Sequence, residues 1–319
     1  MAVYTNIHLN DLKVFLKRYS IGSLLYYQGI EEGIENSNFI LYTTEGRFVL
    51  TLYEKRISKN DLPFFCSLMQ HLSQRGIPCP QPVVQSDGTT IGELAGRPAA
   101  IITFLEGMWI RQPNICHCGE VGTSLAQLHL AGRDFTLSRK NTLSVMDWKL
   151  LWKHCQMSKD ALLKEFGQKI DMELAFLHKN WPSDLPTGII HADLFNDNVF
   201  FLNHHLSGII DFYFACNDFW AYDLAICLNA WCFEQDHSYS LSKAHKLLEN
   251  YQKIRPLLPL ELKAIILLAR GASLRFLLTR LYDWFNTPPD SFVVKKDPRE
   301  YWHKLCFFSS IDSLSELGF

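Results

Sequence analysis

The chain has 319 residues, a formal net charge of −2 at pH 7, and apolar and charged fractions of 48% and 20%. Such values are typical of a globular protein, and a charge this small provides no basic field for nucleic acid. No apolar run approaches the ~20 residues of a membrane span, and the N-terminal segment MAVYTNIHLNDLK lacks the apolar region of a secretory signal. The nine scattered cysteines favour reduced thiols. We therefore expect a cytoplasmic protein without a nucleic-acid or membrane partner.

The N-terminal part of the chain predicts one helix followed by strands. Asn10 can cap the helix, whose apolar residues recur at helical spacing from Leu12 to Tyr19. Strands are expected over 24–30, 38–43 and 47–53, and a helix over 59–74. Pro78, Pro80 and Pro82 then impose an extended path. Further strands over 83–85, 90–94 and 98–105 would complete a small antiparallel sheet.

From residue 106 onward the pattern is mostly helical. The expected helices cover 120–130, 147–155, 159–179, 222–233, 241–254 and 259–285. Only the segment 187–212 interrupts this series. The order predicts an α+β, bilobal protein-kinase-like fold. Residues 1–105 would form a nucleotide-binding lobe and residues 106–319 a helical catalytic and substrate lobe, with ATP in the cleft between the lobes.

The interrupting segment carries the strongest chemical signal of the chain. It reads HADLFNDN from His191 to Asn198, and Asp211 follows in the run GIIDF. Phosphoryl transfer from ATP needs a carboxylate near the attacking hydroxyl and oxygen ligands for Mg²⁺. The spacing D-x-x-x-x-N supplies Asp193 as that carboxylate and Asn198 as one metal ligand, and Asp211 supplies the second metal ligand. Short apolar strands over 199–202 and 207–212 would bring the three residues together.

Two other residues of this segment have different expected roles. His191 is expected to brace the loop by hydrogen bonds, and Asp197 to be solvated, because the spacing selects Asn198. The alternative for the whole segment is a β-hairpin with a polar entry loop, which leaves the placement of the three polar residues as coincidence.

The nucleotide side gives weaker signals. The run QGIEEGIENSN lies between two predicted strands, and its Gly33, Asn36, Ser37 and Asn38 could lay backbone N–H groups over phosphates. A plain hairpin loop explains the same run equally well, since the strict G-x-G-x-x-G spacing is absent. The backbone of Thr103, Phe104 and Leu105, at the change between lobes, is expected to bind the adenine. Cys116, His117 and Cys118 resemble a metal cluster, but without a second ligand pair they are better interpreted as a helix start.

The assembled motifs resemble the aminoglycoside phosphotransferase and choline kinase superfamily of small-molecule kinases, and most closely the homoserine kinases of that fold. The resemblance is carried by ENSNF, FVLTLYE, LPFF, IIHADLFNDN, IDFYFAC, YDLAI, NAW and LRFLLTRLYDW, which keep their order over most of the chain. It implies ATP- and Mg²⁺-dependent phosphorylation of L-homoserine in threonine biosynthesis, with Asp193 as base. The enzyme would be a monomer or a weak homodimer.

The chain departs from the kinase pattern on the third strand. Kinases of this fold usually carry a Lys or Arg there, paired with a Glu of the following helix. Thr51 occupies the strand position, and the helix stretch LPFFCS offers no acid. Both members of the ion pair are missing together, which is self-consistent because a buried Lys without its Glu would be costly. Lys55 or Arg56 could replace the charge, although a solvated turn is favoured for both.

Homoserine needs a cation for its carboxylate. Arg275 and Arg280 lie within an apolar run and are equal candidates, with an internal ion pair, for instance to Asp283, as the alternative. Tyr213 and Trp231 are candidates for the wall of the acceptor pocket. An aromatic wall would also suit choline, so a choline-, ethanolamine- or aminoglycoside-type kinase is the second hypothesis. A catalytically inactive nucleotide-binding protein is the third, supported only by the missing lysine.

Overall fold

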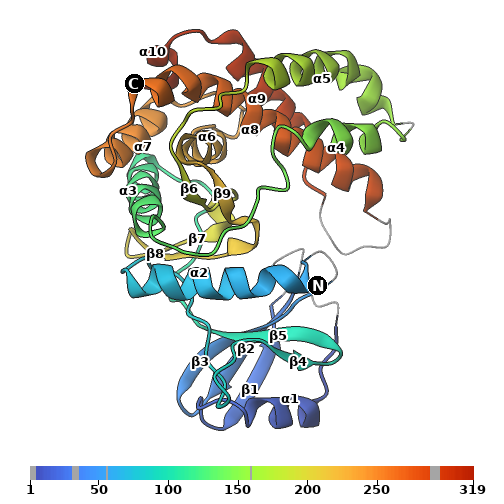
Figure 1. Ribbon diagram of the computed structural model, residues 1–319, viewed down its shortest axis with the longest axis vertical. Coiled ribbons are helices and arrows are strands. Elements are labelled where there is room, and N and C mark those ends of the chain that lie inside the picture. Colours follow the sequence, from blue (N-terminus) through green and yellow to red (C-terminus); the bar gives the residue numbers. More distant parts are fainter. Residues whose placement is uncertain (1–4, 31–35, 55–56, 159, 288–294) are drawn as a thin grey trace. The chain divides into compact units, whose positions relative to one another are not determined.

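The structure is a computed structural model, and it describes residues 5–30, 36–54, 57–158, 160–287 and 295–319. The chain divides into two compact units (Figure 1). The N-terminal unit takes in the chain up to Gly107 together with residues 207–213, and the C-terminal unit takes in residues 108–206 and 214–319. Residues 207–213, which include Asp211, were expected from the sequence in the helical lobe, and they are grouped with the N-terminal unit instead.

A five-stranded antiparallel sheet forms the centre of the N-terminal unit. Its strand order is β1-β2-β3-β5-β4, with bounds Leu24–Gly29, Ser37–Thr43, Gly46–Leu52, Arg97–Thr103 and Gly92–Leu94 in that order. Residues 83–85 form no strand of this sheet: Val83 donates its N–H to the oxygen of Ile101 at 2.8 Å, and Gln85 forms an isolated bridge with Tyr19. The three prolines explain this difference, because a proline has no N–H to donate to a ladder.

The two faces of this sheet have different surroundings. One face packs on α1 (Leu9–Leu16), which begins after His8 rather than after Asn10 as predicted, and forms an apolar core with Phe39, Leu41 and Leu50. Side chains of a strand alternate between the two faces of a sheet. The opposite face therefore carries Ile40, Val49 and Ile102, which lie in register on β2, β3 and β5 and are only partly buried. The connection to β4 contains a short 3-10 helix, Lys59–Asp61, and α2, Leu62–Gln74.

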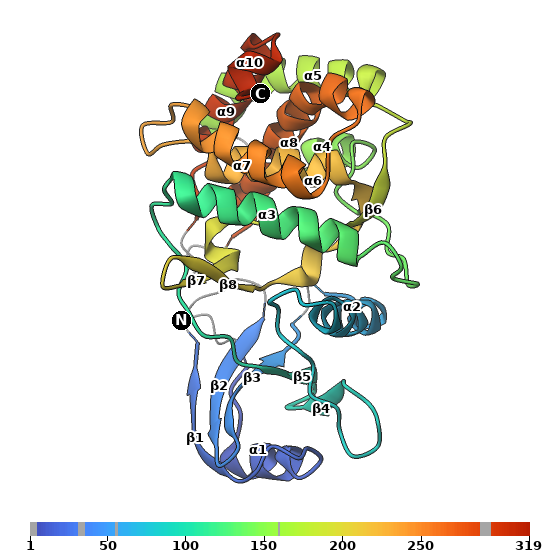
Figure 2. The same ribbon diagram turned by 90° about the vertical axis from the view of Figure 1, so that its left-hand side faces the viewer.

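The C-terminal unit is mostly helical. Its helices are α3 Ile115–Ala131, α4 Trp148–Cys155, α5 Ala161–Asn180, α6 Trp220–Trp231, α7 Leu241–Ile254, α8 Pro259–Asn286, α9 Arg299–Ser310 and α10 Leu314–Leu317. Helix α6 is buried along almost its whole length. Helices α3 and α7 run side by side (Figure 2), and a Cβ at Gly122 would lie 2.2 Å from the carbonyl oxygen of Leu247. The absence of a side chain at Gly122 therefore permits their close approach.

Three features of the C-terminal part were absent from the sequence interpretation. Helices α9 and α10 were not predicted, and neither was β9, Cys216–Phe219, which pairs antiparallel with β6, Thr187–Ile190. The buried residues of α9 do follow helical spacing, from Tyr301 through Lys304 and Leu305 to Phe308. A lysine at a core position interrupts the apolar stripe, which is why periodicity alone overlooked this helix.

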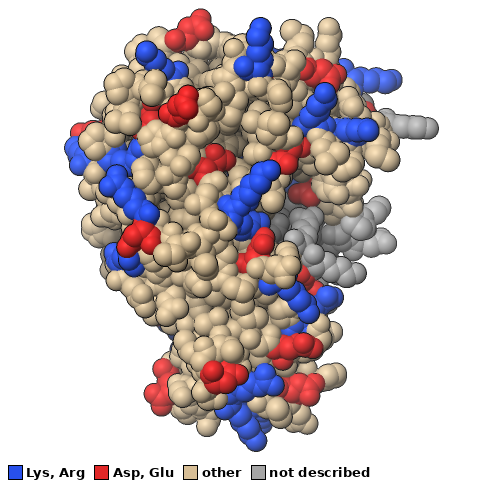
Figure 3. Space-filling model, viewed as in Figure 1, with Lys and Arg blue, Asp and Glu red and all other residues tan. Residues whose placement is uncertain are grey.

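A hairpin of β7, Val199–Leu202, and β8, His205–Ile209, follows the predicted catalytic loop, and the boundary between the two units runs through β8. Within the described ranges, no helix has the length and apolar character to cross a membrane. On the face drawn in Figure 3, Lys and Arg side chains are interspersed with Asp and Glu. This mixture agrees with the small net charge of the sequence.

Candidate active site

The loop between β6 and β7 brings Asp193 and Asn198 into direct contact. The Nδ2 of Asn198 donates to the backbone oxygen of Asp193 at 2.8 Å and to its carboxylate Oδ2 at 3.2 Å. A 3-10 turn, Asn196–Asn198, makes this contact possible by directing the chain back toward Asp193. Both bonds use the amide nitrogen, so neither occupies the amide oxygen of Asn198, which is the kind of hard ligand that a cation such as Mg²⁺ prefers.

Asp223, in the first turn of α6, holds the start of this loop. Its carboxylate oxygens accept the backbone N–H groups of His191 and Ala192 at 2.7 and 2.9 Å. Ala192 has φ of 63°, a left-handed conformation that costs about 1–2 kcal/mol for a residue with a side chain. The two charge-assisted bonds offset that strain. Asp223 therefore braces the loop.

Further contacts fix the carbonyl groups and side chains of the loop. The indole of the fully buried Trp231 donates to the oxygen of Leu194 at 2.7 Å, and Nη1 of Arg275 donates to the oxygen of Ala192 at 2.6 Å. His191 is also fully buried, and its Nδ1 accepts the backbone N–H of Asp193 at 3.3 Å. Trp231 and Arg275, expected to touch the acceptor, are instead seen to support the loop around Asp193.

A buried chain of hydrogen bonds continues behind Asp223. Nε2 of His129 donates to Asp223 at 3.1 Å, and Nδ1 of His129 lies 2.8 Å from the hydroxyl of Tyr251. That hydroxyl accepts from Arg255 at 3.1 Å, and Arg255 also pairs with Glu261 at 2.8 Å. The bonds thus all donate in one direction, from the guanidinium of Arg255 toward the carboxylate of Asp223, which strengthens each of them.

The protonation states follow from this chain. Burial lowers the pKa of His129 below its ordinary value, although its hydrogen bond to Asp223 opposes the shift. Burial would raise the pKa of Asp223, but the hydrogen bonds from the His129 ring and from the backbone N–H of His191 lower it overall. The loop is therefore anchored by an ionised carboxylate and a neutral imidazole, whose Nδ1 accepts from Tyr251.

Asp211 follows β8 and lies in the N-terminal unit. Its φ is 63°, so the predicted metal ligand has the same left-handed conformation as Ala192 of the loop. Strained conformations of this kind persist where the surroundings impose them, and they concentrate at functional sites. The strain supports the interpretation of Asp211 as a residue held in place for function.

Neutral side chains occupy the position of the missing Lys–Glu pair. Thr51 of β3 donates to the amide oxygen of Asn38 on β2 at 2.8 Å, and the hydroxyls of Tyr213 and Tyr53 lie 3.4 Å apart. The α2 stretch without an acid includes the buried Cys66, whose pKa burial raises to about 11. Tyr213, expected at the acceptor pocket, thus packs inside the N-terminal unit. Lys55 and Arg56, the possible replacements for the lysine, are outside the described residues.

The other candidate nucleotide residues differ in their surroundings. Gly33 is outside the described residues. Asn36 accepts the backbone N–H of Glu54 at 3.3 Å, and the buried Ser37 donates to the carboxylate of Glu54 at 2.8 Å. These two side chains therefore fix the end of the hairpin. Asn38 is only partly buried, and its amide nitrogen is oriented by the bond from Thr51 to its oxygen.

The candidate adenine segment begins at the last residue of β5. Thr103 is tied to Gln81 by two bonds of 2.9 Å, one from each backbone N–H. The guanidinium of Arg47 lies 4.3 Å from the centre of the Phe104 ring and also pairs with Glu106. Phe104 and Leu105 lie beyond the strand, so the sheet ladder does not use their backbone groups. This leaves them available to a base, as the prediction requires.

The Cys-His-Cys run is an ordinary helix start, as the sequence analysis favoured. His117 and Asn114 form a reciprocal capping box at the N-terminus of α3. Cys116 is exposed, whereas the buried Cys118 donates to the oxygen of Trp231 at 3.6 Å. Across the described ranges, no three His, Cys, Asp or Glu side chains are placed to hold a metal ion.

The catalytic loop joins two strands and holds Asp193 in contact with Asn198. Together with the antiparallel sheet and the helical unit, this loop defines the class of protein as a kinase-like phosphotransferase. Comparison with known proteins agrees. The model of the phosphotransferase enzyme family matches residues 27–257. A homoserine kinase of Bartonella tribocorum is 82% identical over all of both chains, and one of Brucella anthropi is 59% identical over all of this chain and 98% of that one.

The solved structure of a microcompartment-associated aminopropanol kinase superposes with a TM-score of 0.72 at 14% identity, covering 98% of this chain and 99% of that chain. At this identity it shows the fold alone. The chain therefore belongs to the phosphotransferase enzyme family, in the group of homoserine kinases that it matches over its whole length. The predicted α+β, protein-kinase-like fold is confirmed.

Proposed function

We propose that this protein transfers the γ-phosphoryl group of ATP to the hydroxyl of L-homoserine, giving O-phosphohomoserine and ADP. The observation that carries the proposal is the 82% identity to a homoserine kinase over the full length of both chains. The loop of Asp193 and Asn198 supplies the chemistry of a phosphotransferase. The reaction would serve threonine biosynthesis in the cytoplasm.

The proposed reaction forms a bond between the acceptor oxygen and the γ-phosphorus, and breaks the bond between that phosphorus and the β–γ bridging oxygen. The hydroxyl proton passes to the carboxylate of Asp193, and ADP leaves with the bridging oxygen. The hydrogen bond from Asn198 to Oδ2 of Asp193 fixes the rotamer of the carboxylate. The base is thus oriented before the acceptor arrives, which lowers the cost of reaching a reactive geometry.

The donor set suits Mg²⁺. Asn198 presents an amide oxygen because its nitrogen is bound to Asp193, and Asp211 has a carboxylate, so both offer the hard oxygen ligands that this ion prefers. When bound, the ion would neutralise the charge on the phosphates. Asn38 and Thr51 contribute neutral groups where other kinases have a lysine, so more of this neutralisation falls to the metal ligands.

The choline- and aminoglycoside-type alternatives receive no specific support. Trp231 is fully buried and bound to Leu194, and Tyr213 packs against Tyr53 and Phe65. The two aromatic residues that made an aromatic cage plausible therefore have other partners. The intact contact between Asp193 and Asn198 also argues against an inactive protein.

A coupled ADP-release assay with homoserine, serine, choline and kanamycin tests the proposal. We expect homoserine to be preferred, and comparable rates with choline would reject it. Asp193→Ala should lower kcat by at least about 10²–10⁴-fold, the usual contribution of a general base, while ATP binding is retained. Asp184→Asn, which changes an exposed carboxylate bonded to Ser183, is the control and should behave as wild type. Activity that survives in the Asp193 variant would move the base elsewhere.

A further inference from the structure

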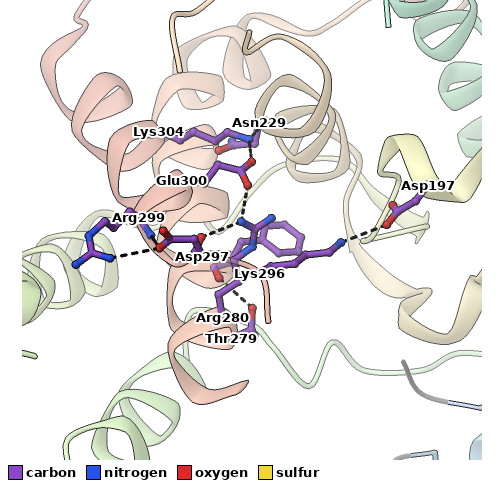
Figure 4. Close-up of polar contacts among 10 residues, drawn as sticks. Asp197, Asn229, Thr279, Arg280, Lys296, Asp297, Arg299, Glu300 and Lys304 are labelled. Atoms are coloured by element: carbon purple, nitrogen blue, oxygen red, sulfur yellow. Dashed lines mark hydrogen bonds and ion pairs between the residues drawn. The ribbon is translucent and has the colours of Figure 1, made fainter. Parts of the chain in front are cut away.

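Four side chains where α8 faces α9 form a compact group, here called the α9 cluster: Arg280, Glu300, Tyr301 and Lys304. Glu300 lies between the two cations, accepting from Arg280 at 2.5 Å and from Lys304 at 2.6 Å. Lys304 also donates to the carbonyl oxygen of Asn229 at the end of α6, at 2.8 Å (Figure 4). Arg280 and Lys304 each lie 4.5 Å from the centre of the Tyr301 ring.

The α9 cluster carries an excess positive charge. It contains two cations and one carboxylate, and burial is outweighed by the two cations, so the pKa of Glu300 falls to about 2. The side chains of Arg280 and Lys304 are only 11% and 4% exposed. A charge withdrawn from water to this extent needs a partner. Glu300 is shared between the two cations, and burial lowers the pKa of Lys304 against the charge of Glu300.

Two members of the cluster also have unused hydrogen-bonding groups. Arg280 uses only Nη1, which contacts Glu300 and the carbonyl oxygen of Asp297, and the described residues provide no acceptor for its Nε and Nη2. The Tyr301 hydroxyl is fully buried and finds no partner in the described part of the chain. An unpartnered buried hydroxyl is costly, so its persistence beside a half-used guanidinium indicates a group that a ligand completes.

The cluster borders the catalytic loop within the C-terminal unit. The Tyr301 ring lies 5.2 Å from the ring of Phe276 and 6.5 Å from that of Phe195, and Phe195 is two residues beyond Asp193. Burial raises the pKa of Tyr301, and the charges of Arg280, Glu300, Asp193 and Arg275 all act on it. The hydroxyl thus lies within the field of both the base and the arginines.

We propose that Arg280 and Tyr301 bind the α-carboxylate of the amino-acid acceptor, Arg280 through Nε and Nη2 and Tyr301 through its hydroxyl. This rests on the proposed function and names the residues that make the site specific for an amino acid. An acceptor carboxylate would add a second anion to the cluster and accept from the unused donors of Arg280 and Tyr301 together. Arg275 has a different role, because its Nη1 donates to the backbone oxygen of Ala192 and so supports the catalytic loop.

The site should discriminate by charge. The compound 3-aminopropan-1-ol is homoserine without its carboxylate, so it would leave Arg280 and Tyr301 unpaired. A site built to bind a polar group rejects an analogue that lacks it, because the buried partners lose their bonds. The wild-type protein should therefore strongly prefer homoserine to this amino alcohol, and the preference should depend on Arg280.

The experiment measures kcat and KM for both acceptors in Arg280→Met, Tyr301→Phe and the control Arg299→Met. Arg299 lies on α9 with Tyr301, and its half-exposed side chain pairs with Glu165 at 3.5 Å and with Asp297 at 3.9 Å (Figure 4 shows the pair with Asp297). We expect Arg280→Met to raise KM for homoserine about 100-fold, the value of a lost charge-assisted fork, and to leave kcat/KM for 3-aminopropan-1-ol within about threefold. Arg299→Met should match the wild type with both acceptors.

Tyr301→Phe separates binding from folding. Removing a hydroxyl that has no partner should leave the melting temperature of the free protein unchanged or higher, while KM for homoserine rises about tenfold. If Arg280→Met does not fold, Arg280→Lys keeps a cation beside Glu300 but loses the fork, and the same rise in KM is expected. An unchanged ratio of kcat/KM between the two acceptors in the Arg280 variant overturns the inference. Absence of homoserine phosphorylation by the wild type would instead reject the proposed function.

Discussion

His129 makes a specific prediction about stability and pH. In the folded protein burial lowers its pKa, so the imidazole is neutral, whereas in the unfolded chain its pKa is about 6.5. Protonation in the folded state would make Nδ1 a donor to Tyr251, whose oxygen already accepts from Arg255. The phenolic hydrogen would then lose its acceptor, and a second cation would lie close to Arg255. The structure thus opposes protonation of His129 by both burial and hydrogen bonding.

The sign and size of this pH effect on stability follow from the difference in the pKa of His129 between the folded and unfolded states. Because the pKa of His129 is lower when folded than when unfolded, its contribution to stability is present above pH 6.5 and is lost as the pH falls below it. Between pH 7.5 and 5.5 protonation of this histidine stabilises the unfolded state by about 1.4 kcal/mol, which is the largest loss of folding stability that His129 can cause in this interval. His129→Gln keeps a donor for Asp223 without a titrating group, so this part of the pH dependence should disappear.

Equilibrium urea unfolding at pH 7.5 and 5.5 measures this contribution. The wild-type protein should lose more stability than His129→Gln across this interval, by up to about 1.4 kcal/mol, with all other histidines cancelling in the difference. His178→Gln, at an exposed position on α5, is the control and should retain the wild-type pH dependence. If His129→Gln and the wild type lose equal stability, the imidazole is not neutral in the folded protein, and the direction assigned to the hydrogen-bond chain is wrong.

Other substitutions test the loop and the nucleotide side. Trp231→Phe leaves the oxygen of Leu194 unpaired, so the free energy of unfolding measured in urea should fall by about 1–3 kcal/mol and kcat should fall as well. A variant as stable as the wild type would contradict the role of the indole. Arg275→Met removes a charged donor from Ala192, so kcat should fall about tenfold while KM for homoserine changes less than about twofold; a large rise in KM would return Arg275 to the acceptor site. Thr51→Val frees the amide of Asn38 and should raise KM for ATP about threefold without affecting homoserine; an unchanged KM for ATP would exclude this pair from phosphate binding.

Local patterns in the sequence were sufficient for much of the fold. The strands 24–29, 37–43 and 46–52 and the long helix 259–286 lie where alternation and helical periodicity predicted them. The contact of Asp193 with Asn198 was implied by spacing, since a five-residue separation within one tight loop leaves few other arrangements. The replacement of the Lys–Glu pair by neutral residues could also be predicted from the sequence, because the strand and the helix that carry the pair in other kinases were both recognisable.

The partners of buried charges were not predictable in the same way. Arg275 and Arg280 were indistinguishable as candidates, since both lie in one apolar run of α8. Five residues of helical rotation direct them to different neighbours, so one holds Ala192 and the other meets Glu300 on α9, a helix that periodicity had missed. Trp231 and Tyr213 were assigned by residue type alone, and their packing gave them other roles.

The amino-acid sequence by itself determined the reaction class, because the groups that perform phosphoryl transfer lie close together along the chain at fixed spacing. Only the tertiary structure decided which side chains support those groups and which are free to meet an acceptor. The Asp223–His129–Tyr251 chain and the α9 cluster both join residues far apart in sequence. Such contacts depend on how helices pack, and packing is decided by the whole set of buried surfaces rather than by any local pattern.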